Sequence, residues 1–387
     1  MASRPRKILL FPQSNVLGHL TRTLALAEEF DAQGDEVHVV LSRAHGSLKT
    51  VLPPGLRILA SPEMQLPRTR SDPLASYEDG LAADRANLDR AGALGASEKS
   101  RYGRRLRQMI ERDTAIIRDV DPDVVIADQR VTPALIRDVG PDRMFHVASV
   151  LGYPSFFRRV SGTLPFPLGS GHLLVPGVRE IEYWRRPAAP AVDRRRESLC
   201  GPFRWEGWRR LNRDAAPPPA SDVFLFFGST GNSGRIMPWL LRHLPERYRV
   251  SGIAFRAAGG DARRGAHISA RGNLEDFLVR TSVAFCHGGH GTVMECILQR
   301  TPMVIFPHNI EQLEIGRQVE RMGLGVLVKR PYHQLGGAEL GTIVEGLRAD
   351  GRIAARLEKY SALLRRRNGA RRAVAVVHRS LAESGSA

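Results

Sequence analysis

The chain has 387 residues, of which 42% are hydrophobic and 25% are charged, enough apolar material for two packed domains of ordinary size. Its cysteines are too few for a disulfide framework and show no Cys-x-x-Cys metal spacing; they are Cys200, Cys286 and Cys296. No stretch approaches the roughly 20 apolar residues of a membrane span, and the apolar run at 8–12 behind the basic N-terminus is too short for a signal peptide. We therefore expect a cytoplasmic protein with buried free thiols.

Lysine and arginine outnumber aspartate and glutamate by 17, a balance that can mark a nucleic acid or membrane partner. The basic residues are mostly scattered arginines, without interleaved aromatic side chains and without a nucleic-acid-binding motif. We therefore expect no nucleic acid partner and interpret the charge mainly as solvated surface. The alternative is an anionic acceptor or peripheral contact with an anionic membrane, with Trp184, Trp205 and Trp208 as loosely fitting interfacial side chains.

The first half of the chain opens with a strand, a helix and a strand joined by short connections. Residues 7–11 form an apolar run typical of a buried parallel strand, and residues 19–33 carry apolar side chains at helical spacing. Gly34 ends this helix, and residues 36–41 follow as the next strand. This order predicts a βαβ unit and therefore a parallel sheet.

Further along the first half the pattern is weaker. We expect loop and helix at 68–99, a helix at 101–120, and strands at 121–128 and 145–150. The stretch 152–219 is rich in proline, glycine and arginine without a clear period, and its terminal Pro-Pro-Pro is the best linker candidate.

The second half repeats the same organisation. The predicted strands are 223–227, 250–254, 283–286, 303–306 and 325–328, and the predicted helices are 274–281, 292–300, 312–322 and most of the tail from 352. The sequence therefore predicts an α/β protein of two consecutive domains with Rossmann-like parallel sheets, at 1–215 and 216–387, with the last helix packing back on the first domain.

The segment from Cys286 to Thr292, CHGGHGT, lies between a predicted strand and a predicted helix. Gly288, Gly289 and Gly291 allow backbone N–H groups to approach a ligand closely, and the following helix presents its positive dipole end. His287 and Thr292 add side-chain donors. Because open α/β sheets bind ligands at the carboxyl ends of their strands, a diphosphate is the expected guest. The alternative is a tight turn without a ligand.

Three polar residues follow this turn at informative positions. Glu295 lies on the first turns of the predicted helix, where a carboxylate could accept a ribose hydroxyl pair or act as a partner of the helix dipole. Glu311 and Gln312 follow the next strand and Pro307, so both segments open onto one crevice. An acid beside an amide can bind several sugar hydroxyls; the alternative is an N-terminal capping pair.

Four segments together resemble, in order and spacing, the donor-binding signature of a known family. They are the residues from His287 to Glu295, the TPMVIFP strand at 301–307, the pair at 311–312 and the Gly-Leu-Gly at 323–325. That family is the nucleoside-diphosphate-sugar glycosyltransferases of the GT-B fold, including antibiotic and natural-product enzymes and, more distantly, the enzyme that adds N-acetylglucosamine to the lipid-linked peptidoglycan precursor. Gly228 and Ser229 resemble its donor-contacting "GS" turn. The resemblance implies two Rossmann-like domains with parallel sheets facing a central cleft, the second binding the donor and the first the acceptor.

The first half matches this family more loosely. Gly18 and His19 resemble its "GH" turn, whose histidine is a general base in many members, and Asp128 lies where many members carry the orienting carboxylate. Without the resemblance, His19 could contact backbone at a helix start and Asp128 could be a cap or surface acid. Arg22 stands where the family often has proline, and Glu311 replaces its usual aspartate, which is expected to change acceptor class and sugar preference.

The resemblance implies transfer of a sugar, with inversion, from a nucleoside-diphosphate sugar to a hydroxyl or amine of a small-molecule acceptor, in bacterial natural-product biosynthesis. No cofactor beyond this co-substrate is expected, and no Asp-x-Asp cluster at a strand end suggests a metal. The alternatives are a glycosyltransferase acting on a lipid-linked acceptor at a membrane, a sugar-nucleotide 2-epimerase of the same fold, and a non-catalytic partner subunit. A monomer or homodimer is expected.

Overall fold

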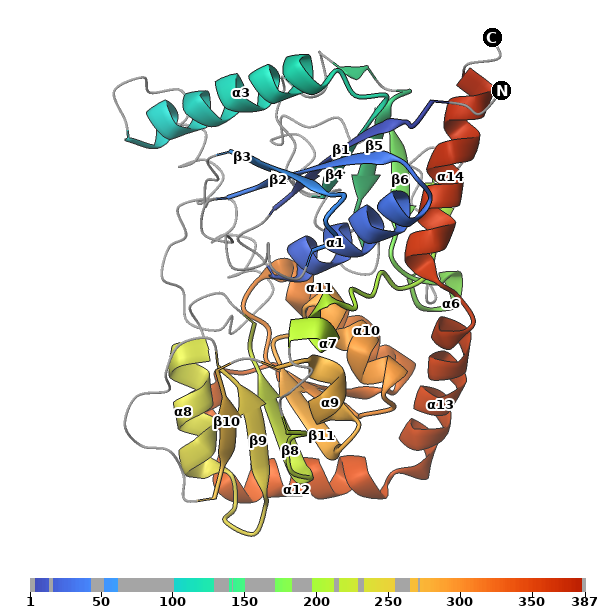
Figure 1. Cartoon of the computed structure of the whole chain (residues 1–387). Coiled ribbons are helices and arrows are strands. Elements are labelled where there is room, and N and C mark those ends of the chain that lie inside the picture. The colour runs from blue at the N-terminus through green and yellow to red at the C-terminus, as the bar shows by residue number, and fades with distance from the viewer. Residues whose placement is uncertain are drawn as a thin grey trace.

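The computed structural model describes residues 4–13, 17–42, 52–61, 101–128, 139–140, 142–149, 171–182, 197–211, 216–228, 233–254, 265–270 and 272–384. Two α/β bodies lie one above the other in Figure 1, each built around its own sheet. The predicted α/β class and pair of parallel sheets are confirmed.

The first sheet has the order β3-β2-β1-β4-β5-β6-β7, and all its pairings are parallel. Its strands are β1 (Lys7–Pro12), β2 (Glu36–Leu41), β3 (Arg57–Ala60), β4 (Val124–Asp128), β5 (Met144–Val147), β6 (His172–Val175) and β7 (Glu197–Leu199). The central strands are continuous apolar runs because helices cover both faces. Side chains of α1 (Leu17–Ala32) pack on one face, and those of α3 (Arg101–Val120) pack on the other.

The second sheet has the order β10-β9-β8-β11-β12-β13, again with parallel pairings. Its strands are β8 (Ser221–Phe226), β9 (Val250–Ile253), β10 (His267–Ser269), β11 (Thr281–Cys286), β12 (Met303–Ile305) and β13 (Gly325–Leu327). One face packs against α9 (Leu274–Leu278), α10 (His290–Leu298), α11 (Ile310–Met322) and α13 (Gly351–Arg365). The other face packs against α8 (Ser233–His243) and α12 (Gly337–Ala349), with η3 (Tyr332–Gln334) beside them.

The chain passes between the two bodies in more than one place. After β7 it runs through α7 (Gly207–Leu211) to β8, and after α13 it returns as α14 (Gly369–Ser384), whose Ala373 and Val377 lie in the core cluster of the first sheet. Figure 1 shows this last helix, in red, alongside the upper body. The two crossings touch: a Cβ on Gly369 would collide with the carbonyl oxygen of Gly201, and a Cβ on Gly201 would lie 2.8 Å from Cβ of Arg367.

A short helix of the first half also takes part in the second core. In α6 (Arg179–Glu182), Ile181 packs with the apolar side chains of α10 and α13. Sequence analysis found no period in this region, yet the described parts of 152–219 contain β6, α6, β7 and α7. These elements have three to five residues each, too few to show a period, and they are ordered by their neighbours.

Candidate functional site

A cleft with a cavity volume of about 280 Å³ is lined by both halves of the chain. The first half contributes the N-terminal turn of α1 and the connection at 202–209, and the second half contributes the N-terminal ends of α10 and α11 and the turn before α9. The predicted site residues that line it are His19, Gly228, His287, Gly289, Gly291, Thr292, Glu295, Glu311 and Gln312. Asp128 and Gly288 lie directly behind this lining, and Ser229 falls outside the described residues, as does the predicted segment 68–99.

The glycine turn joins β11 to α10 as its sequence suggests. Gly288 has φ +81°, a left-handed conformation that favours glycine, and a Cβ there would lie 2.7 Å from Cγ2 of Ile305. Gly289 is the N-cap of α10, and the amide of Val293 donates to its carbonyl oxygen at 3.0 Å. The amides of residues 290–292 therefore have no partner within the helix, which suits an anion at this dipole end.

Two buried histidines lie beside this turn. Burial lowers the pKa of His287 to about 4, although a hydrogen bond with the backbone of Phe226 acts in the opposite direction. Burial, together with the neighbouring His287, lowers the pKa of His308 to about 3. Within the described part of the chain, Nδ1 of His287 and both ring nitrogens of His308 lack a hydrogen-bond partner. Both imidazoles are therefore neutral at pH 7 and can act as hydrogen-bonding groups without adding charge.

At the start of α11 the N-cap is Asn309, so the alternative of Glu311 and Gln312 as the capping pair does not hold. The side-chain oxygen of Asn309 accepts from the amide of Gln312 at 2.9 Å, and Oε1 of Gln312 accepts from the amide of His308 at 2.8 Å. This second bond fixes the Gln312 side chain and leaves its NH2 group as a donor. Glu311 lies on the same turn and lines the cleft, so an acid and an amide share this wall.

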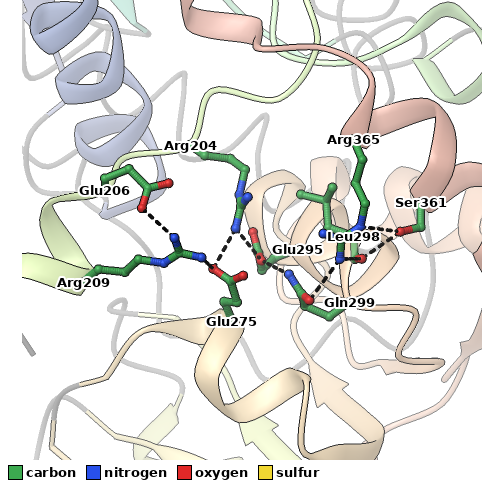
Figure 2. A network of polar contacts seen from close by, with 9 residues as sticks. All are labelled: Arg204, Glu206, Arg209, Glu275, Glu295, Leu298, Gln299, Ser361 and Arg365. Atoms are coloured by element: carbon green, nitrogen blue, oxygen red, sulfur yellow. Dashed lines mark hydrogen bonds and ion pairs between the residues drawn. The ribbon is translucent and has the colours of Figure 1, made fainter. Parts of the chain in front are cut away.

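Glu295 belongs to a network of charged side chains shown in Figure 2. Its Oε1 accepts from Nε2 of Gln299 at 2.8 Å and lies 3.6 Å from Nη2 of Arg204. Burial raises the pKa of Glu295, opposed by the charge of Arg204 and the bond from Gln299. Arg204 and Arg209 both donate to Oε2 of Glu275, at 2.8 Å and 2.6 Å. Through Arg204, the connection between the two sheets is thus paired with Glu295, the carboxylate expected to contact a ribose.

The predicted pairing of His19 with Asp128 is present in the geometry. Nδ1 of His19 lies 2.7 Å from Oδ1 of Asp128, whose side chain is fully buried. Arg22 adds a contact that sequence analysis did not anticipate, because its Nε and Nη2 donate to the two oxygens of Asp128 at 2.5 Å each. Burial alone would raise the pKa of Asp128, but the charges of Arg22 and His19 and their hydrogen bonds hold it below its usual value.

A second buried contact joins the two bodies next to the glycine turn. Nε2 of His290, the first residue of α10, lies 2.7 Å from Oε1 of Glu182 at the end of α6. The hydroxyl of Ser149 donates to the other oxygen of Glu182 at 3.2 Å. Sequence analysis missed Glu182, because nothing in the local pattern shows that α6 reaches the second core. The pair holds the start of α10 against the first half.

Among the described residues, no group of three or more His, Cys, Asp or Glu side chains is arranged to hold a metal ion. No helix in the described part of the chain is long and apolar enough to cross a membrane. Cys200, Cys286 and Cys296 are free and buried.

Comparison with solved structures gives matches over the whole length of the chain. A glycosyltransferase of kitacinnamycin aligns with a TM-score of 0.68 and 19% identity, covering 98% of this chain and 100% of that one. The calicheamicin glycosyltransferase CalG4 aligns with a TM-score of 0.67 and 20% identity, over 98% and 99% of the two chains. The chain has the GT-B fold. The spinosyn rhamnosyltransferase SpnG shares it, with a TM-score of 0.67 and 16% identity over 97% and 100% of the chains.

Comparison by sequence gives weaker matches. A rhamnosyltransferase of PGL/p-HBAD biosynthesis from Mycobacterium tuberculosis is 22% identical, over 85% of this chain and 78% of its own length. No protein-family model matches the chain. In GT-B terms, the start of α1 on the first half faces the N-terminal ends of α10 and α11 on the second half across the cleft.

Proposed function

We propose that this GT-B protein is an inverting glycosyltransferase that moves a sugar from a nucleoside-diphosphate sugar to a hydroxyl of a small-molecule acceptor, without a metal ion. The observation that carries the proposal is the composition of one cleft: a helix N-terminus with unpaired amides lies on the second half, and a histidine bound to a buried carboxylate lies on the first. Solved neighbours support it, since SpnG has been seen with thymidine diphosphate and with spinosyn aglycone, and SsfS6 with thymidine diphosphate.

In the proposed reaction, the diphosphate lies against the amides at the start of α10, with Thr292 as a further donor. Glu311 and Gln312 bind the hydroxyls of the sugar, and Glu295 binds the ribose. These contacts place the anomeric carbon in the cleft, facing the first half of the chain.

The acceptor hydroxyl attacks the anomeric carbon on the face opposite the diphosphate. The new C–O bond takes its electron pair from the acceptor oxygen, the bond from the anomeric carbon to the phosphate oxygen breaks, and its electron pair leaves with the diphosphate. Nε2 of His19 takes the acceptor proton, while Nδ1 donates to Asp128 and so fixes the tautomer. Fixed donors stabilise the departing diphosphate, so no cation is required.

The proposal is tested in two steps. Isothermal titration with UDP, dTDP and GDP identifies the nucleotide, and turnover of the matching sugar nucleotide is then followed with a panel of small alcohols and phenols. We expect His19→Ala to lower turnover by about 10²–10⁴-fold with unchanged nucleotide affinity, and Thr292→Val to weaken nucleotide binding. His333→Ala, an exposed histidine outside the cleft, is the control and should change neither.

Incubation of the donor without acceptor distinguishes the proposed transferase from the alternative, a sugar-nucleotide 2-epimerase. A sugar-nucleotide epimerase converts its donor under these conditions, whereas a transferase hydrolyses it slowly. Failure of every nucleotide to bind, or full turnover by His19→Ala, would remove the proposed function.

A further inference from the structure

Arg22 lies where the two halves of the proposed reaction meet. It is on α1, three residues after His19, so both side chains leave the same face of the helix. The side chain of Arg22 is 10% exposed and that of Asp128 is fully buried. An arginine in such a place is there to form a specific charge contact, because burying an unpaired guanidinium is unfavourable.

Two polar groups, from Arg22 and His19, compete for one oxygen of Asp128. Oδ1 lies 2.5 Å from Nη2 of Arg22 and 2.7 Å from Nδ1 of His19, and the same Nη2 lies 2.7 Å from Nδ1. If Nδ1 carries a proton, it donates to Asp128 beside a cation. If Nδ1 is bare, it accepts from Arg22, and the proton sits on Nε2, where it blocks the nitrogen that must receive the acceptor proton.

The charge balance of this cluster differs from that of an isolated histidine and carboxylate. Arg22 binds both oxygens of Asp128 in a fork, so a large part of the carboxylate charge is already compensated before His19 gains a proton. Burial alone would lower the pKa of Arg22, but Asp128, then Glu311 and Glu182, keep it above its usual value. Arg22 therefore stays charged. Asp128 on β4 and Arg22 on α1 contact His19 directly, and Glu311 on α11 and Glu182 on α6 act on Arg22 through their charges.

We propose that Arg22 is a positioning residue that sets the protonation of His19, by sharing the Asp128 carboxylate with it and so keeping the imidazole free of its second proton. This inference rests on the proposed function in one respect, the role of His19 as base. Its electrostatic part concerns the free protein and holds without a substrate.

The test is a titration of His19 by NMR in the substrate-free protein with isotope-labelled histidine, its signal assigned by comparison with His19→Gln. In Arg22→Met, a side chain of similar length without charge, we expect the imidazole to lose its proton at a pH higher by about 1 unit or more, because Asp128 then serves His19 alone. Arg22→Lys retains the positive charge and should titrate close to wild type. The acidic limb of kcat/KM should move in parallel with the NMR titration.

Two further variants keep the test decisive. Arg4→Met removes another arginine that is bound to an aspartate, Asp123, but at the opposite end of β4, and should leave His19 unchanged. Arg22→Met combined with Asp128→Asn removes both buried charges and should remove the upward shift, so it serves if Arg22→Met alone does not fold.

Equal titration of His19 in Arg22→Met and Arg4→Met would overturn the inference. An upward shift that persists in the double variant, relative to Asp128→Asn alone, would also overturn it, because Asp128 would then not be the shared group. A shifted titration in a protein that transfers no sugar would instead remove the proposed function alone. A wild-type titration in Arg22→Met, with His19-dependent transfer intact, would remove the role of Arg22 alone.

Discussion

Replacement of Gly291 by alanine tests whether this glycine is needed for ligand binding and not for the fold; Gly288, by contrast, is expected to be needed for the fold. Gly291 is the second residue of α10 and lines the cleft, and apart from its chain neighbours and the backbone of its own helix no atom lies within 4 Å of the position that its Cβ would take. Alanine lowers the entropy of the unfolded chain and suits a helix, so we expect the free energy of unfolding to stay the same or rise by about 0.5–1 kcal/mol.

The same methyl group would enter the space in which the diphosphate is proposed to meet the helix amides. Losing one or two hydrogen bonds to a charged phosphate costs about 1.5–3 kcal/mol each, so nucleoside-diphosphate affinity should fall at least about 10-fold. Urea unfolding measures the first quantity and isothermal titration the second. Gly288→Ala is the contrast, since its left-handed φ and the nearby Ile305 predict a loss of about 1–3 kcal/mol in stability. Undiminished nucleotide binding by a stable Gly291→Ala protein would refute a diphosphate at this helix end.

The remaining predictions concern acid stability, metal ions and the network around Glu295. Below about pH 6.5 the unfolded chain protonates His287 and His308 while the folded chain does not, until about pH 4 and 3. As the pH is lowered through this window, the free energy of unfolding should therefore fall by about 1.4 kcal/mol per pH unit for each histidine. His308→Gln should flatten this dependence in urea unfolding, and an unchanged slope would contradict the prediction. Turnover should survive excess EDTA, and a loss reversed by Mg²⁺ would show the metal-free mechanism to be wrong. Glu275→Gln frees arginines to pair with Glu295, so nucleotide affinity should fall by about 1 kcal/mol, while Glu206→Gln, which contacts Arg209 alone in this network, should leave titrations unaltered.

Sequence patterns predicted the central strands well because parallel strands covered on both faces are continuous apolar runs. The strands at 7–11 and 223–227 are β1 and β8, each within a residue or two of its observed limits. The edge strand β7, Glu-Ser-Leu, was not predictable, since only its pairing with β6 makes it a strand. The helix predicted from 292 begins at His290, because the glycine at 289 is already its cap.

In the site, residues that directly follow a strand end were predictable from the sequence, whereas residues contributed by short segments distant in sequence were not. His19 and Asp128 were paired correctly as neighbours because β1 and β4 are adjacent and end at the same edge. Whether they act as base and carboxylate stays a prediction. Arg204 lines the cleft and Glu182 contacts His290 behind it. Both come from short, aperiodic segments, so their positions depend on tertiary packing that no local pattern encodes.

The contact between Gly201 and Gly369 constrains how the cleft can open. Both connections between the sheets pass through this point, and neither glycine has room for a side chain. A movement of one half relative to the other would therefore disturb this contact least if it turned about a point close to these two glycines. If the cleft binds a nucleotide and an acceptor as proposed, such a turn would open it most on the side far from these glycines.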